Sequence, residues 1–176
     1  MVRHTTRRRQ LLTSACIISS CVLAGCLSDD SADDDPAEEA DDSMKEAFSL
    51  HEEATEPLDG GALETHLDAG EWSECLDALP EIRDGLDDAR DAASDAREAA
   101  DEEDLTEYVD AIDHFLDLID ILHDTLDKVE EMCEAGQDDD HEAMMDALSA
   151  LEDIDADRES KEAQIDSAFE NLEGQD

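Results

Sequence analysis

The stretch EWSECLDALPEIRDGLDDARDAASDAREAA, residues 71–100, spaces its apolar residues alternately three and four positions apart. This heptad spacing predicts an α-helix with one apolar seam. The seam residues are Trp72, Cys75, Leu79, Ile82, Leu86, Ala89, Ala93, Ala96 and Ala100. The stretch LTEYVDAIDHFLDLIDILHDTLDKVEEMCEAG, residues 105–136, repeats the pattern at Tyr108, Ile112, Phe115, Ile119, Leu122, Leu126, Val129 and Cys133. Two such helices joined by a short acidic turn are expected to pack antiparallel.

Folding this hairpin about residue 104 pairs each seam residue of one helix with a seam residue of the other. The alanines of the first helix then face the bulky residues of the second, so that large side chains fill the space beside small ones. The last pair is Cys75 with Cys133, for which we predict a disulfide. Two buried free thiols are the alternative, because the helix separation can exceed the reach of a disulfide. Pro80 predicts either a kink in the first helix or a separate turn over residues 71–79.

Shorter apolar patterns flank the hairpin. The capping-box spacing of Ser43 and Glu46 predicts that a short helix begins there and runs to about Ala54. After residues 136–140, a last helix carries two apolar patches, with the stem of Arg158 covering the seam between them. These patches are Met144, Met145, Leu148, Leu151 and Ile154, then Ile165, Phe169 and Leu172. The predicted fold is all-α, an antiparallel hairpin extended to a three- to four-helix bundle over residues 43–176.

The N-terminus is typical of a secretion signal. Its four arginines precede the first carboxylate, Asp29, and an apolar segment over residues 11–25 follows them. That segment is shorter than the roughly 20 apolar residues that a membrane span requires. A charged start, a short apolar run and small residues before a boundary predict export.

Two motifs in this region resemble those of exported lipoproteins. TRRRQLL (residues 6–12) resembles the twin-arginine signal, and LAGC (residues 23–26) resembles the lipobox. The residues that carry the two likenesses are Arg8, Arg9, Leu11 and Leu12, then Leu23, Ala24, Gly25 and Cys26. The resemblance implies cleavage before Cys26 and lipid on its sulfur, which would anchor the chain to the outer face of the membrane. The alternatives are cleavage at Cys21, where ISSC fits a looser pattern, and an uncleaved N-terminal anchor.

Cleavage before Cys26 would leave seven Lys and Arg against 55 Asp and Glu, a formal charge of −48. Such a charge destabilises a compact state by self-repulsion, which salt of about 1 M screens within roughly 3 Å. With the signal, this composition resembles haloarchaeal lipoproteins, and it argues against nucleic-acid binding. We therefore predict a signal peptide over residues 1–25, and a lipidated cysteine with a disordered acidic tether over residues 26–42.

No candidate catalytic residue, cofactor site or metal site withstands inspection of the sequence. HEAMM (residues 141–145) lacks the second histidine of a zinc-protease helix, and its His141, Met144 and Met145 are interpreted as a helix start plus two core methionines rather than copper ligands. The stretch 155–166 lacks the glycine and final glutamate of a calcium loop. Asp120 and His123 are interpreted as part of a solvated face, together with the acids Asp110, Asp113, Asp117, Asp124 and Asp127.

The sequence therefore predicts a non-catalytic, lipid-anchored module that offers a helix groove to an envelope protein partner. The alternative is a lipoprotein that binds a metal or another ligand and serves a transporter. An enzymatic function is disfavoured because the sequence shows no motif that pairs a nucleophile with a general base.

Overall fold

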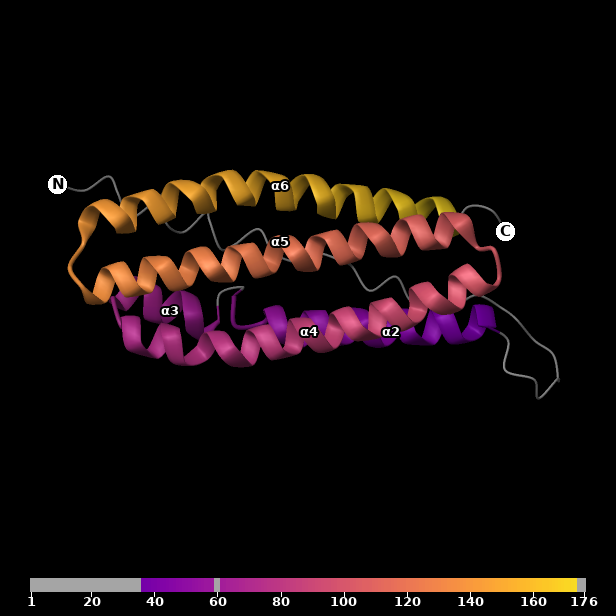
Figure 1. Cartoon of the computed structure of the whole chain (residues 1–176), viewed down its shortest axis with the longest axis horizontal. Coiled ribbons are helices and arrows are strands. Elements are labelled where there is room, and N and C mark those ends of the chain that lie inside the picture. Colours follow the sequence, from indigo (N-terminus) through magenta and orange to yellow (C-terminus); the bar gives the residue numbers. More distant parts are fainter. Residues whose placement is uncertain (1–35, 59–60, 174–176) are drawn as a thin grey trace.

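The computed structural model describes residues 36–58 and 61–173, which form five α-helices and no strand. The helices are α2 (Pro36–Thr55), α3 (Ala62–Ala69), α4 (Trp72–Glu102), α5 (Thr106–Gln137) and α6 (His141–Glu173). The four long helices run alternately up and down, and the short α3 lies at one end beside α4 (Figure 1). The all-α bundle built on an antiparallel hairpin is confirmed.

The α4–α5 hairpin buries the two predicted seams. Every seam residue of these helices is buried except Trp72 and Tyr108, which are half-buried. α5 also buries a second stripe, because it packs against α6 as well as α4. That stripe consists of Ala111, Leu118, Met132 and Ala135.

Ion pairs between α4 and α5 follow the predicted register. Arg97 Nε lies 2.6 Å from Asp113 Oδ1, and Arg83 Nη2 lies 2.7 Å from Asp127 Oδ1. Between them, Arg90 pairs with Asp120. The three arginines are seven residues apart, as are the three aspartates, so the pairs repeat once per heptad beside the seam.

Two aspartates make the turns that join the long helices. Asp104 and Asp139 have φ angles of 59° and 56°, in the left-handed region that a helix-ending residue commonly adopts. The N–H of the next residue then bonds back to the last turn, from Leu105 to Ala100 and from Asp140 to Ala135. Asp140 also caps α6, since its Oδ1 accepts from the N–H groups of residues 142 and 143.

Aromatic side chains close the bundle between helices that are not sequence neighbours. The ring centroids of Phe48 on α2 and Phe115 on α5 are 4.8 Å apart, in an edge-to-face arrangement. Phe48 also lies 5.4 Å from Phe169 of α6, which itself lies 6.1 Å from Tyr108. These contacts place α2 in the fourth position of the bundle.

The prediction that the first helix begins at Ser43 is wrong. α2 begins at Pro36, because proline is favoured in the first turn of a helix and a heptad seam of small and apolar residues starts at Ala40. That seam, buried throughout, is Ala40, Met44, Ala47, His51 and Ala54. Residues 36–42 therefore belong to the bundle rather than to a disordered tether. The signal, the lipobox and residues 27–35 lie outside the described residues.

The predicted disulfide is also wrong. Cys75 and Cys133 face each other in the predicted layer, but both are free thiols that are fully buried. Burial raises the pKa of both thiols, that of Cys133 to about 12. Helices packed at a normal separation bring facing thiols into contact without the shorter approach that an S–S bond requires.

The helices α4 and α6 are each continuous. α4 is one helix from residue 72 to residue 102, with the exposed Pro80 inside it, so a separate turn over 71–79 is excluded. α6 is also one helix. As predicted, Arg158 covers its seam and is only 5% exposed.

Candidate functional site

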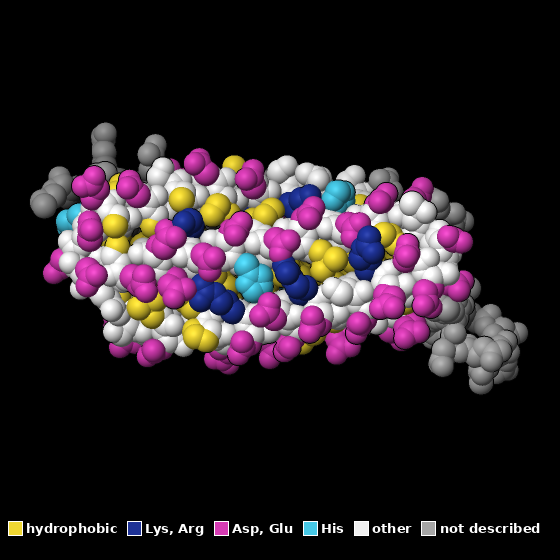
Figure 2. Space-filling model, viewed as in Figure 1, with side chains coloured by type: hydrophobic (Ala, Val, Ile, Leu, Met, Phe, Trp, Pro, Cys, Tyr) yellow, Lys and Arg dark blue, Asp and Glu magenta, His cyan; other side chains and the backbone are white. Residues whose placement is uncertain are grey.

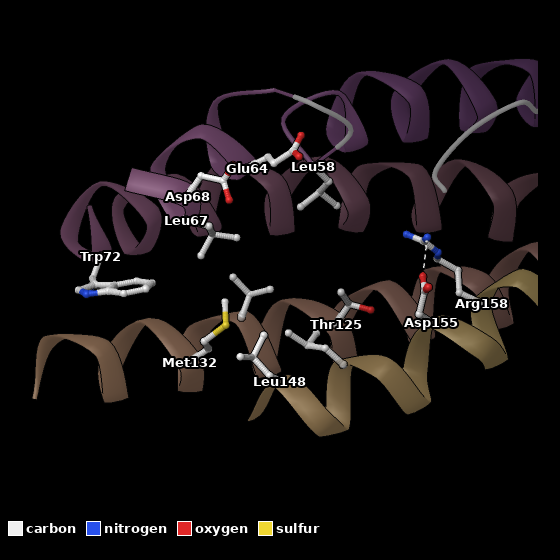
Figure 3. Close-up of a pocket in the computed structure, with 12 residues that line it drawn as sticks. Leu58, Glu64, Leu67, Asp68, Trp72, Thr125, Met132, Leu148, Asp155 and Arg158 are labelled. Atoms are coloured by element: carbon white, nitrogen blue, oxygen red, sulfur yellow. Dashed lines mark hydrogen bonds and ion pairs between the residues drawn. The ribbon is translucent and has the colours of Figure 1, made fainter. Parts of the chain in front are cut away.

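A groove opens where the fourth position of the bundle changes from α2 to α3. α2 ends at Thr55, whereas α4, α5 and α6 continue past this level, and the eight-residue α3 only partly fills the space. The cavity within this groove has a volume of about 60 Å³, and the rest of the groove is open to solvent. It is lined by Leu58, Glu64, Leu67, Asp68, Trp72, Thr125, Val129, Met132, Leu148, Leu151, Asp155 and Arg158 (Figure 3).

The walls of the groove are mostly apolar. Leu58 and Leu67 approach from one side, and Met132 and Leu148 from α5 and α6 on the other (Figure 3). Trp72 stands at one end, where its indole packs against Gly136. A Cβ on that glycine would lie 2.5 Å from the ring, so only glycine at this position leaves the indole where it is.

Arg158 and Asp155 form the opposite end (Figure 3). Arg158 follows Met144 and Leu151 at seven-residue spacing, so a guanidinium occupies a core position of the α6 seam. Its Nη2 donates to Asp155 Oδ1 at 2.7 Å. Its Nε lies 3.6 Å from Glu162 Oε1 and, among the described residues, has no hydrogen-bond partner. Burial raises the pKa of Asp155, and the charge of Arg158 opposes that shift.

Two further carboxylates reach the groove from α3. Glu64 is half-buried and Asp68 is exposed, and neither has an ion-pair partner within residues 36–58 and 61–173. The acids therefore differ in kind, since Asp155 is neutralised by Arg158, whereas Glu64 and Asp68 carry uncompensated charge. The groove is apolar along its length and negative along its α3 wall.

The groove lies far from the end at which the described chain begins. α2 starts at the end of the bundle that holds the α4–α5 turn, and α3 lies at the end that holds the α5–α6 turn (Figure 1). The 20 residues of α2 span about 30 Å at 1.5 Å per residue. Pro36 and the groove are therefore separated by most of the length of this helix.

Four of the six α5 aspartates that were predicted to form a solvated face take part in ion pairs with neighbouring helices. Asp113, Asp120 and Asp127 pair with arginines of α4, and Lys161 Nζ of α6 lies 2.9 Å from Asp117 Oδ2. His123 Nε2 lies 3.3 Å from Asp87 Oδ1, without hydrogen-bond geometry. All seven Lys and Arg of residues 36–173 are in ion pairs, and on the face in Figure 2 the basic side chains lie among the more numerous acids.

The prediction of a helix start and two core methionines at residues 141–145 is only partly confirmed. Met144 is buried, as expected of a core methionine, but Met145 is 58% exposed and does not contribute to the core. His141 is exposed at the start of α6. Over the described residues, no group of three or more His, Cys, Asp or Glu side chains is placed to hold a metal ion.

The export and lipidation residues, from Arg8 to Cys26, lie outside the described residues. Among the helices that the structure describes, none combines the length and the apolar composition needed to cross a membrane. No protein-family model, curated protein or solved structure shows a significant match to the chain.

Proposed function

We propose that this protein is a lipid-anchored, extracytoplasmic, non-catalytic binding module whose recognition site is the groove between α3, α5 and α6. The anchor is supported by the LAGC motif that ends at Cys26 and by the short apolar segment before it. The observation that carries the binding role is the groove itself, which is concave, mostly apolar and provided with a few polar groups. These features are typical of ligand sites.

The position of the groove supports this arrangement. The nine residues between Cys26 and Pro36 allow ten residue-to-residue steps, which reach at most about 35 Å, since an extended residue spans 3.3–3.6 Å. The anchor would then be joined to the bundle at the end opposite the groove. The site would therefore face away from the membrane, toward molecules that diffuse outside the cell.

A small ligand fits the groove better than a protein partner does. Stable protein interfaces usually bury about 800 Å² on each side over a broad surface, whereas this groove is narrow and follows about ten residues of α6. We therefore place ligand binding first and docking of an envelope protein second. Delivery of the ligand to a transporter is the natural role of such a module.

The test compares three variants of the tagged chain in a halophilic host at full salt. Cys26→Ser should release the protein from the membrane into the medium, and retention would contradict the anchor. Leu148→Glu places a charge in the groove, and Met145→Glu makes the same change at an exposed position of the same helix. Each protein is purified, and bound small molecules are extracted and analysed by mass spectrometry.

We expect a compound that co-purifies with the wild type and with Met145→Glu but not with Leu148→Glu. Crosslinking of native membranes is carried out in parallel. If the crosslinks instead reveal a stoichiometric protein that Leu148→Glu loses, then the groove is a docking site and the adaptor role moves to first place. If neither a compound nor a protein depends on Leu148, the groove is not the recognition site.

A further inference from the structure

The charges along the groove are unequal, and this inequality indicates what kind of ligand it accepts. Among the residues that the structure describes, Arg158 is the only cation that lines the groove, and the carboxylates of Asp155 and Glu162 both lie within 4 Å of its guanidinium. The Arg158 end therefore presents no net positive charge to an incoming group. An anionic ligand would also face Glu64 and Asp68 on the α3 wall.

A cationic group meets the opposite situation. Glu64 and Asp68 are four residues apart on α3, so both lie on the same side of that helix, and both line the groove. A positive charge placed beside them would compensate two carboxylates that have no ion-pair partner within the described residues. The indole of Trp72 lines the same groove, and an aromatic ring attracts a cation that lies within about 6 Å of it.

The remaining surface of the groove requires an apolar body on the ligand. The lining from Leu148 to Arg158 follows eleven residues of α6, whose ten rises of 1.5 Å make about 15 Å of helix. Leu58, Leu67, Val129, Met132 and Leu151 supply the walls over this length. A purely ionic ligand would leave this apolar surface uncovered.

We propose that the groove binds an amphiphilic cation, meaning an elongated apolar molecule that carries one amine or quaternary ammonium group. The apolar body lies between α3 and the α5–α6 pair, and the charged nitrogen lies beside Glu64 and Asp68. This inference rests on the proposed function, because it specifies the ligand class of the same groove.

The single tryptophan of the chain makes the test direct, since Trp72 lines the groove and its fluorescence reports on that site alone. The chain carrying Cys26→Ser is used so that no detergent is needed, and it is kept in concentrated salt. Three probes share one alkyl chain and differ in charge: octyltrimethylammonium, octanoate and octanol. We expect a saturable change of Trp72 emission with the cation and an affinity for octanoate at least tenfold weaker.

A double variant identifies the carboxylates responsible. Glu64→Gln with Asp68→Asn should weaken binding of octyltrimethylammonium roughly fivefold, the effect of losing two partly exposed charge pairs. Glu152→Gln with Asp153→Asn removes the same charge from exposed positions of α6 and should leave the affinity unchanged. Circular dichroism of both variants verifies that the helices remain intact.

The outcomes separate the two proposals. Equal affinities for the three probes would overturn the cation preference while supporting a groove that binds apolar ligands. Tighter binding of octanoate, lost on Arg158→Gln, would also overturn it and would assign the polar group to the opposite end. If no probe changes the emission of Trp72, then the ligand-binding function fails together with the inference.

Discussion

Replacing His51 with leucine should stabilise the protein, and the gain should increase as the pH falls. His51 occupies a core position of the α2 seam, is 4% exposed and lies 5.4 Å from the ring centroid of Phe115. Its Nε2 has no hydrogen-bond partner among the described residues. An unpaired buried polar atom costs about 1–3 kcal/mol. An apolar side chain of similar volume removes this cost, so we expect His51→Leu to add about 1–2 kcal/mol at neutral pH.

The pH dependence follows from the same burial. Burial lowers the pKa of His51 from 6.5 to about 4 in the folded protein. As the pH falls below 6.5, the unfolded chain therefore takes up a proton that the folded chain does not. The contribution of this group to stability is complete above pH 6.5 and is lost progressively as the pH falls toward 4. At pH 4.5 the loss is about 2.5 kcal/mol, since one pKa unit corresponds to about 1.4 kcal/mol.

The measurement is urea-induced unfolding, followed by circular dichroism in one concentrated salt at pH 7.5, 6.0 and 4.5. Protonation of the many carboxylates also changes stability, but it affects both proteins and cancels in the difference between variant and wild type. That difference should widen by about 2.5 kcal/mol from pH 7.5 to pH 4.5. His141→Leu, which removes an exposed imidazole, is the control. A difference that stays constant with pH would refute the buried neutral imidazole.

Three further outcomes are expected. Helical circular dichroism should fall as salt drops below about 1 M, because repulsion among the acids is no longer screened; an unchanged spectrum in dilute buffer would contradict this. Cys75 and Cys133 should resist alkylation until urea unfolds the chain, and a crosslink between them on a non-reducing gel would show that the thiols are not free. Arg90→Gln should cost less than about 1 kcal/mol of unfolding free energy, because its ion pair is partly exposed. Arg158→Ala should cost about 3 kcal/mol or more, because it leaves Asp155 without its partner; equal shifts of the urea midpoint would contradict the contrast.

The α4–α5 hairpin could be predicted from the sequence because two long seams constrain each other. Alanine seam residues such as Ala93 and Ala96 can pack only against bulky partners, and Phe115 and Ile112 stand at the matching positions. One register satisfies every layer, so the buried residues and the pairing of Cys75 with Cys133 in one layer followed from spacing. The state of those thiols did not follow, because it depends on a separation between helices that spacing does not determine.

The start of α2 and the groove could not be predicted in the same way. The acidic run before Ser43 is typical of a disordered chain. Residues 36–42 form a helix because the bundle buries Ala40, and the position of those packing partners cannot be read from the sequence. The groove arises because α2 ends before its neighbours do, which is a comparison between helices placed in space. Two signals were nevertheless present: the break over residues 56–61 and an arginine, Arg158, at a seam position of α6.

The placement of the cations indicates that they specify which helices pack together more than they add to total stability. The seven Lys and Arg that follow residue 25 cannot neutralise 55 acids, yet Arg83, Arg90 and Arg97 all bridge α4 to α5, and Lys161 bridges α6 to α5. Pairs as exposed as these each contribute little. However, a slip of the hairpin by half a heptad would set all three arginines away from their aspartates and bring acids opposite acids. The helices of this chain mostly repel one another. The free-energy difference between the correct and the slipped register is therefore larger than the stabilisation that any one ion pair contributes.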